Sequence, residues 1–426
     1  MMANIGIVTY TMLFYCLLPF ALLRLAYRGL RAPDYFKRWP ERFGFFSGEV
    51  NQPSIWIHAV SVGELQAAIP VIRALQANYA AVPIVVTTTT PTGLARAQAE
   101  FGETIIAGHI PYDTPGAVRR FLQNTQPKIA IIMETELWPN LFDQCLRRNV
   151  PVAVINARLS ERSARGYRRF AKLIRFTLDR ISWIAAQNES DGQRFLSLGL
   201  APERLSSTGN VKFDQAISLD AIEQGEELKK AIGKRPVWIA ASTHEGEDEA
   251  VLQAFRVLKQ RFPDLFLILV PRHPERFKVV REKCINQEWK VVQRSTHQAL
   301  QADTDILLGD TMGELMGLYA ASDIAFVGGS LVPTGGHNML EPAALGLPTI
   351  TGKHTFNFAE ITEQLLAIEA AQQIKDAHEL ADVVTRFLKY PNLKQQAGSA
   401  GQQWINANKG ATARVVERLD ELINHE

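Results

Sequence analysis

The chain has 426 residues, more than one hydrophobic core usually serves, and this length predicts two domains of roughly 200 residues each. Apolar residues make up 46% and charged residues 21%, which excludes a disordered or low-complexity chain. The net charge is only +2, so basic charge is local rather than global: residues 147–180 hold ten Arg or Lys and two acids. Such a block is either a solvated helix face or a surface for an anionic partner.

The three cysteines, Cys16, Cys145 and Cys284, lie far apart and show no spacing typical of a zinc site or a disulfide framework. This pattern favours a reducing, cytoplasmic setting.

The N-terminal segment predicts a membrane anchor. Residues 5–23 carry no charge and are mostly apolar, which is long enough for a helix that crosses a bilayer or lies in it. Six Arg or Lys follow between residues 24 and 42, and by the positive-inside tendency they place the body in the cytoplasm. Because no charge precedes the apolar run and no small-residue cleavage site follows it, an anchor is favoured over a signal peptide.

The body alternates short apolar runs with helical patterns, in two successive series. Continuous apolar runs of this length predict strands buried on both faces of a parallel sheet. The runs of the first series are 55–60, 84–88, 129–134, 152–156 and 183–187, and those of the second are 237–241, 265–270, 305–310, 324–329 and 348–352. The predicted fold class is α/β, with two Rossmann-like doubly wound domains facing across a cleft.

We expect an anchor over residues 1–28, a first domain over 29–208 and a second over 209–426, with a hinge near 206–213. The last helix is a candidate to pack back on the first domain. In doubly wound sheets ligands bind outside the carboxyl ends of the strands, so the polar residues after each run are the candidate site.

Three carboxylates follow strands of the first domain. Glu64 opens a helix after the first strand, where it either complements the helix dipole or serves as a general base. Glu134 ends the run 129–134 and Glu136 follows two residues later, before Trp138; strand alternation would put both side chains on one side. We therefore expect these acids to contact a ligand.

In the second domain, phosphate-binding residues are expected after two strands. Ser242 and Thr243 precede a helix whose first amides could hold a phosphate. Arg272 and His273 follow a long apolar strand and are fixed by flanking prolines, which suits phosphate recognition by the arginine.

Two further segments predict contacts with a nucleotide. Backbone groups of Met312 and Gly313 could read a base edge. The stretch 327–348 contains two glycine pairs, with Gly329 and Ser330 after a strand; Asn338 could open a helix that binds phosphate, and Glu341 could hold ribose hydroxyls. A capping interaction between these last two residues is compatible with that role.

The sequence closely resembles bacterial 3-deoxy-D-manno-octulosonic acid (Kdo) transferases over nearly its whole length, including the segments that hold these residues. No single motif carries the resemblance; their order and spacing do. The matching segments are the N-terminal anchor and residues 61–64, 133–140, 156–160, 209–214, 242–247, 271–277 and 335–342.

The resemblance implies a GT-B glycosyltransferase that moves Kdo from CMP-Kdo to a lipid A precursor (lipid IVA) in lipopolysaccharide synthesis, with inversion and without a metal or other cofactor. Glu64 would be the general base, supported by Glu136 or, less favourably, Glu134. Lys212 would join the donor-binding residues named above. Arg158, Arg162 and Arg165 would bind the acceptor's phosphates rather than nucleic acid, at the cytoplasmic face of the inner membrane.

Two alternatives remain from the residues alone. A hydrolysing sugar-nucleotide epimerase would share the fold and the glycine-rich site but needs no anchor. A non-enzymatic lipid-binding protein would explain the anchor and basic block but not the carboxylates at strand ends. The number of Kdo units transferred is left open.

Overall fold

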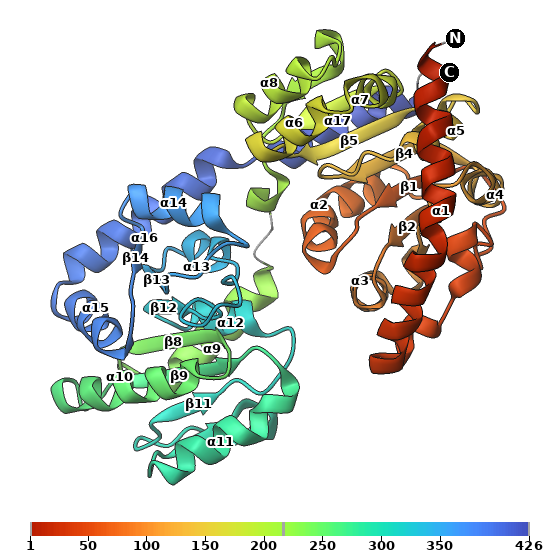
Figure 1. Ribbon diagram of the computed structural model, residues 1–426. Coiled ribbons are helices and arrows are strands. Elements are labelled where there is room, and N and C mark those ends of the chain that lie inside the picture. Colours follow the sequence, from red (N-terminus) through yellow and green to blue (C-terminus); the bar gives the residue numbers. More distant parts are fainter. Residues whose placement is uncertain (1, 215–217, 425–426) are drawn as a thin grey trace. The chain divides into compact units, whose positions relative to one another are not determined.

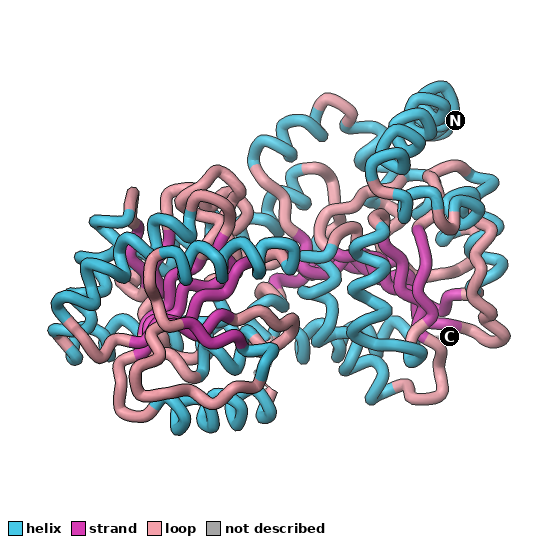
Figure 2. Tube along the Cα trace, turned by 90° about the horizontal axis from the view of Figure 1, so that it is seen from below, coloured by secondary structure: helices cyan, strands magenta, loops and turns pink. Residues whose placement is uncertain are grey.

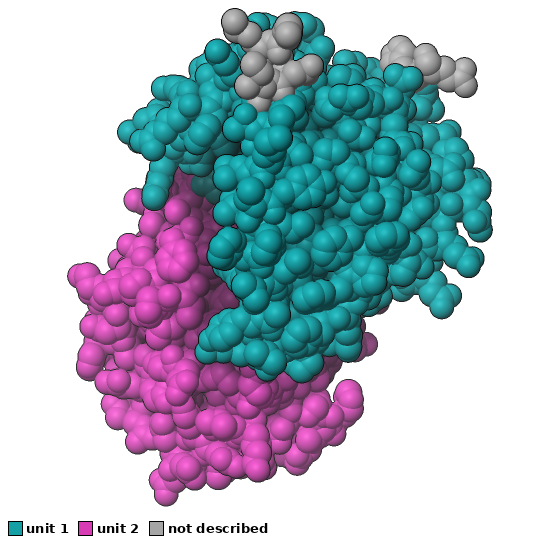
Figure 3. Space-filling model, turned by 45° about the vertical axis from the view of Figure 1, so that its right-hand side comes forward, with its two compact units in different colours: residues 1–215, 408–426 teal, residues 216–407 magenta. Residues whose placement is uncertain are grey.

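The structure is a computed structural model that describes residues 2–214 and 218–424. The chain divides into two compact units, residues 1–215 with 408–426 and residues 216–407 (Figure 3). Each unit contains one seven-stranded sheet in which every strand pair is parallel. The predicted fold class, two doubly wound α/β domains, is confirmed.

In unit 1 the strand order is β3-β2-β1-β4-β5-β6-β7. The order reverses between β1 and β4, which makes the edge beyond these two strands the expected ligand site. The strands are β1 (Ser54–His58), β2 (Ile84–Thr88), β3 (Ile106–His109), β4 (Pro127–Met133), β5 (Val152–Ala157), β6 (Trp183–Ala186) and β7 (Leu205–Ser207).

The strands of unit 1 have apolar side chains on both faces, and two buried clusters lie on opposite sides of the sheet. Along β1, Ile55 and Ile57 belong to one cluster and Trp56 to the other. Helices therefore cover both faces, as Figure 2 shows. They are α2 (Val62–Asn78), α3 (Pro91–Phe101), α4 (Pro115–Thr125), α5 (Pro139–Leu146), α6 (Glu161–Arg168), α7 (Ala171–Leu178), α8 (Glu189–Ser197) and α17 (Ala411–Asn424), with short 3-10 turns η1 (Pro33–Phe36), η2 (Trp39–Phe43), η3 (Gly102–Thr104), η4 (Pro202–Arg204) and η5 (Val211–Asp214).

The last helix belongs to unit 1, although it follows unit 2 in the chain. Val415 and Leu419 of α17 are buried in the same cluster as the apolar face of α2. Asp214 accepts hydrogen bonds from the backbone N–H groups of Gly410 (2.6 Å) and Thr412 (2.5 Å), which fastens the start of α17.

Unit 2 has the strand order β10-β11-β9-β8-β12-β13-β14, which reverses between β8 and β12. The strands are β8 (Val237–Thr243), β9 (Phe266–Pro271), β10 (Val291–Gln293), β11 (Ile306–Leu308), β12 (Ile324–Val327), β13 (Thr349–Thr351) and β14 (Ala371–Gln373). The helices are α9 (Leu219–Ile232), α10 (Glu247–Arg261), α11 (Phe277–Asn286), α12 (Leu315–Ala320), α13 (Leu340–Ala344), α14 (Ala359–Ala367), α15 (Ala377–Lys389) and α16 (Pro391–Asn408), with turns η6 (Pro274–Arg276) and η7 (Arg294–Thr296).

The N-terminal segment forms one long helix, α1 (Met2–Arg31), which runs along the outside of unit 1 (Figure 1). Residues 6–31 form a helix long and apolar enough to cross a membrane. The helix contacts α5, α7 and η1.

Candidate active site

The first half of the site lies at the switch point of unit 1, after β1 and β4. Ser61 is the N-cap of α2, and its Oγ accepts the backbone N–H of Glu64 at 3.3 Å. Glu64 Oε2 in turn accepts the N–H of Val60 at 2.8 Å. This reciprocal pair resembles a capping box, an interaction of Glu64 that was not predicted from the sequence.

Capping does not account for the electrostatics of Glu64. Burial raises the pKa of its carboxyl to about 7, against the lowering effect of the Val60 N–H. Repulsion from Glu134 and Glu136 raises the pKa further, and Lys212 lowers it. A carboxyl poised near neutral pH at a strand's carboxyl end has the properties of a general base.

Glu134 directly follows β4 and has a left-handed backbone, with φ +55°. Such a conformation is uncommon outside glycine and marks a position that the surrounding structure holds in place. Its N–H donates to Ile155 O at 2.9 Å, and its Oε1 accepts from Lys212 Nζ at 3.0 Å. Lys212, which the sequence suggested as a donor contact, therefore lies in unit 1 beside the carboxylates.

Glu136 is half-buried, and burial raises the pKa of its carboxyl, with Glu134 adding to the rise. Strand alternation does not apply to Glu134 and Glu136, contrary to the prediction, because β4 ends at Met133 and a left-handed residue follows at once. Both carboxylates are nevertheless close enough to influence Glu64.

Asn156 holds the segment that carries Lys212, a role that the sequence did not reveal. Its backbone is left-handed (φ +53°) and its side chain is buried at the end of β5. Asn156 Oδ1 accepts the N–H of Val211 at 3.1 Å, and Asn210 Nδ2 donates to Gln187 Oε1 at 3.2 Å. An asparagine within a strand that is otherwise apolar was the available signal.

The three arginines expected to bind the acceptor lie on and just before α6. Arg158 is exposed, and its backbone N–H donates to Thr135 Oγ1 at 3.2 Å. Arg162 and Arg165 are exposed on the helix, where Arg165 Nε lies 3.8 Å from a carboxylate oxygen of Glu161. They form a basic, solvent-facing surface.

In unit 2, Ser242 and Thr243 end β8, but their contacts are mainly structural. Ser242 has a left-handed backbone (φ +56°), and Thr243 is fully buried. Thr243 Oγ1 donates to Asp248 Oδ1 at 2.7 Å, and Asp248 also pairs with Arg276. The hydroxyl of Thr243 thus stabilises the first turn of α10.

Glu247, the first residue of α10, holds the glycine-rich loop after β12. Its buried carboxylate accepts backbone N–H groups from Gly329 (2.6 Å), Ser330 (2.9 Å) and Leu331 (2.8 Å), and from His244 (2.9 Å). Gly329 and Ser330 were expected to contact the donor, but their backbone N–H groups point to the Glu247 carboxylate. Glu247 itself was missed, because an acidic first turn is an ordinary helix start.

The hydroxyl of Ser330 is buried too. It donates to Val327 O at 2.6 Å and accepts the N–H of Gly352 at 2.8 Å. Gly329 has φ +68°, and a Cβ there would lie 2.9 Å from the His337 ring. The backbone of Gly329 therefore lies so close to His337 that a side chain at this position would clash with the ring.

Three histidines gather next to Arg272. His244 Nε2 lies 2.8 Å from His337 Nε2 with the rings stacked, and His273 meets His244 edge to face at 5.3 Å between ring centroids. Burial, with Arg272 adding to it, lowers the pKa of His337 to about 4. The Arg272 backbone N–H donates to Thr243 O at 3.0 Å, which fixes the start of its loop.

Glu341 is half-buried and receives a hydrogen bond from Asn338 Nδ2 at 3.0 Å. Burial raises the pKa of its carboxyl, while the Asn338 bond and the charge of Arg272 lower it. The helix expected to open at Asn338 is α13, which begins at Leu340 and has only five residues. Its dipole is therefore a weak source of phosphate affinity.

Met312 and Gly313 lie in the turn between β11 and α12. Met312 is exposed and Gly313 has φ +88°. The same turn is tied down by Glu314, which accepts from Arg294 at 3.1 Å and from Thr311. The backbone groups of Met312 and Gly313 therefore belong to a turn that side-chain hydrogen bonds hold in place.

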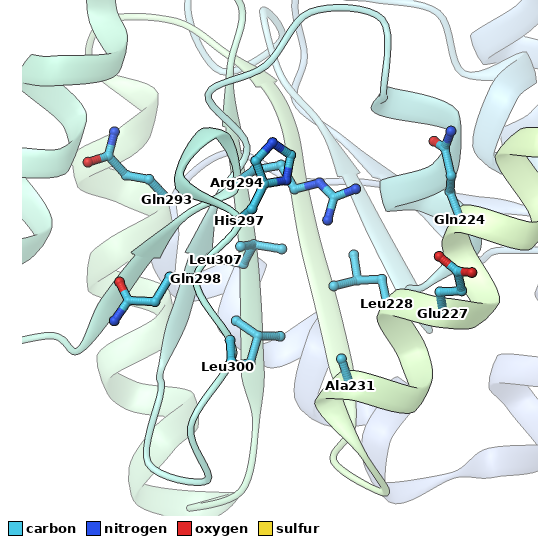
Figure 4. A pocket seen from close by; sticks show the side chains of 11 residues that line it. Gln224, Glu227, Leu228, Ala231, Gln293, Arg294, His297, Gln298, Leu300 and Leu307 are labelled. Atoms are coloured by element: carbon cyan, nitrogen blue, oxygen red, sulfur yellow. The ribbon is translucent and has the colours of Figure 1, made fainter.

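A separate cavity of about 260 Å³ lies in unit 2 between α9 and the segments around β10 and β11 (Figure 4). It contains no residue of the predicted site. Its lining includes Gln224, Glu227, Arg294, His297 and Leu307.

Comparison with known proteins identifies the family. Residues 37–215 match the family model of the 3-deoxy-D-manno-octulosonic-acid transferase N-terminal domain, and residues 240–404 match glycosyl transferases group 1. The 3-deoxy-D-manno-octulosonic acid transferase of Haemophilus influenzae is 42% identical over 96% of this chain and 97% of its own length. The chain belongs to the Kdo transferase family. The Kdo transferase of Bordetella pertussis is 35% identical over 97% of this chain and 98% of its own length.

Membership in the Kdo transferase family makes the chain a glycosyltransferase and does not favour the epimerase alternative. A solved UDP-GlcNAc 2-epimerase from Neisseria meningitidis has a TM-score of 0.59, covering 87% of this chain and 100% of its own. At 16% identity that likeness shows the shared fold alone.

Proposed function

We propose that this Kdo transferase moves Kdo from CMP-Kdo to a hydroxyl of a phosphorylated lipid A precursor, with inversion, at the cytoplasmic face of the inner membrane. The observation that carries the proposal is the position of Glu64, a half-buried carboxyl after β1 that lies near Glu134, Glu136 and Lys212; burial raises its pKa to about 7. Membership in the Kdo transferase family supports Kdo as the transferred sugar, and the Glu64 carboxyl is the proposed general base.

Glu64 acts on the acceptor. Its carboxylate takes the proton of the acceptor hydroxyl as that oxygen bonds to the anomeric carbon of Kdo, and the bond from this carbon to the phosphate oxygen breaks. CMP leaves with the bonding electrons, and Glu64 later releases the proton to solvent. Because burial raises the pKa of Glu64 to about 7, its carboxylate is basic enough to accept a proton near neutral pH.

Lys212 and Glu134 influence the pKa of Glu64, the proposed base. The ion pair at 3.0 Å balances one negative charge beside Glu64, so the pKa of Glu64 stays near neutral rather than rising further. Glu136 contributes a second half-buried carboxyl to the same edge of the sheet. We propose that it supports the base electrostatically.

Unit 2 binds the donor in this proposal. Arg272 provides the cation for the phosphate, in a cluster with His273 and near Glu341, whose carboxyl is suited to ribose hydroxyls. The turn of Met312 and Gly313 would read the base. Charge on the leaving phosphate is stabilised by these fixed groups, so we propose that the reaction needs no metal.

Mass spectrometry of the products formed from purified protein, CMP-Kdo and a tetra-acylated, bis-phosphorylated lipid A precursor tests the proposal. The expected result is acceptor carrying one or more Kdo units, formed equally well in EDTA. Unmodified acceptor with intact CMP-Kdo, from folded protein, would contradict the activity. Activity lost in EDTA and restored by magnesium would contradict the metal-free mechanism only.

A further inference from the structure

Helix α1 packs against the rest of unit 1 near both of its ends. Near its start, the Tyr10 hydroxyl donates to Asp113 Oδ2 and the Thr11 hydroxyl donates to Asn140 Oδ1, both at 2.9 Å. Near its end, Leu25 is buried, and Gly29 lies so close to Phe36 that a Cβ would meet that ring at 2.5 Å.

The partner of Tyr10 belongs to the folded body. Asp113 is buried, and its carboxylate also accepts the backbone N–H groups of Asn140 (3.1 Å) and Leu141 (2.7 Å) at the start of α5. Tyr10 and Thr11 therefore connect α1 to the buried residues Asp113 and Asn140, which meet at the start of α5.

These contacts conflict with a helix that crosses a bilayer. Thr11 and Gly29 are about 27 Å apart along the helix at 1.5 Å per residue, close to the roughly 30 Å of a hydrocarbon core. A crossing α1 would carry the adjoining surface of unit 1 into the hydrocarbon. That surface includes α7, which contacts α1 and exposes Lys172 and Arg175.

The opposite face of α1 is apolar and exposed. At 100° per residue, the large side chains that face away from unit 1 fall on one side, with the exposed Cys16 near its centre. They are Val8, Met12, Leu13, Tyr15, Leu17, Phe20, Leu23, Tyr27 and Leu30.

We propose that α1 lies in the plane of an anionic phospholipid surface and does not cross it. Its apolar face enters the boundary between headgroups and acyl chains, and its inner face stays on unit 1. Exposed cations complement the lipid charge: Arg24 and Arg28 on the last turns of α1, with Lys172 and Arg175 on neighbouring α7. The inference rests on the proposed membrane association and determines its geometry.

Spin labels on the outer face of α1 test the proposal. Cys16 is the exposed thiol of the native chain, whereas Cys145 and Cys284 are buried. We would label Cys16, and in a Cys16→Ser background label Met12→Cys, Phe20→Cys and Tyr27→Cys, in vesicles of phosphatidylethanolamine and phosphatidylglycerol. Collision with oxygen and with a water-soluble nickel complex then reports the depth of each label.

An in-plane helix places all four labels at one shallow depth, about 5–10 Å below the headgroup boundary. A depth that rises to a maximum near the middle of α1 and falls at both ends would overturn the proposal in favour of a spanning helix. Labels that the nickel complex reaches freely, or that a second protein copy covers, would overturn the lipid assignment. Kdo transfer to detergent-solubilised acceptor, measured in parallel, reports separately on the proposed function.

The contacts of Tyr10 and Thr11 can be tested independently. Tyr10→Phe with Thr11→Val should broaden the distance distribution between a label at Cys16 and a second label on the exposed position 128 of unit 1. Tyr15→Phe, which removes the same hydroxyl from the outer face, should not. Equal distributions in the two variants would show that the inner face is not held as proposed.

Discussion

Lys212 Nζ lies 3.0 Å from Glu134 Oε1, although 78 residues separate them in the chain. The lysine reaches this position because Asn156 holds the N–H of Val211 and Asp214 is bonded to the start of α17. The pair neutralises one charge beside Glu64. It therefore controls the pH at which the proposed base is active.

The acid limb of the pH profile should reflect Glu64. A base must be unprotonated, so kcat/KM should rise through a pKa of about 7 and level off at higher pH. Glu134→Gln removes a negative neighbour and should move the limb to lower pH, whereas Lys212→Met should move it to higher pH. Rate profiles of the two variants check the opposite directions, with exposed Glu103→Gln as the matched control. Shifts of the same sign would contradict the assignment.

Donor affinity should depend on Arg272 and Glu341. Hydrogen bonds to charged groups contribute about 1.5–3 kcal/mol, so Arg272→Ala should weaken CMP binding roughly 10- to 100-fold, and Glu341→Ala should weaken it through the ribose. Calorimetric titration with CMP measures both. Arg281→Ala, on the exposed side of α11, removes the same charge and should bind CMP like the wild type. Unchanged affinity in both site variants would refute the donor site.

Glu247 should be required for the glycine-rich loop. A glutamine offers one acceptor oxygen and a donating amide to four N–H groups, so Glu247→Gln should lower the free energy of unfolding by about 1–3 kcal/mol and reduce CMP affinity. Urea denaturation and CMP titration check these outcomes. Glu249→Gln changes an exposed residue of the same helix, paired with Lys283, and should have little effect on either. Equal stability of the two variants would argue against the loop-holding role.

The arginines of α6 should recognise the acceptor. Arg162→Ala with Arg165→Ala should raise the KM for a phosphorylated acceptor and leave the KM for CMP-Kdo unchanged, because these side chains lie in unit 1 on an exposed face. With a dephosphorylated acceptor, wild type and variant should behave alike. Arg119→Ala with Lys128→Ala removes two exposed charges elsewhere on unit 1. If the α6 variant discriminates between the acceptors as well as the wild type does, the surface is only solvated or membrane-facing.

The fold was predictable from the sequence because buried parallel strands read as continuous apolar runs. The runs at 55–60 and 129–134 correspond to β1 (Ser54–His58) and β4 (Pro127–Met133), and their ends locate the carboxylates. The sequence also predicted that Glu64 opens a helix, and it lies in the first turn of α2.

The long-range contacts of the site were not predictable. Glu247 binds a loop 82 to 84 residues away, and nothing in an acidic first turn distinguishes it from an ordinary helix start. The left-handed turn at Glu134 depends on the fold around it, so strand alternation failed there. Lys212 was expected among the donor-binding residues, and its ion pair with Glu134 became visible only in the structure.

Single-turnover transfer by Glu64→Gln tests the role of Glu64 most directly, because the amide keeps the side chain's shape and one accepting oxygen for the Val60 N–H but cannot take a proton. With saturating CMP-Kdo and acceptor, the rate should fall about a hundred- to ten-thousand-fold while calorimetry shows CMP affinity unchanged. Ser61→Ala, which removes the cap and keeps the carboxylate, should lose far less. A Gln variant that transfers Kdo at a near-normal rate would contradict the assignment of Glu64 as the base.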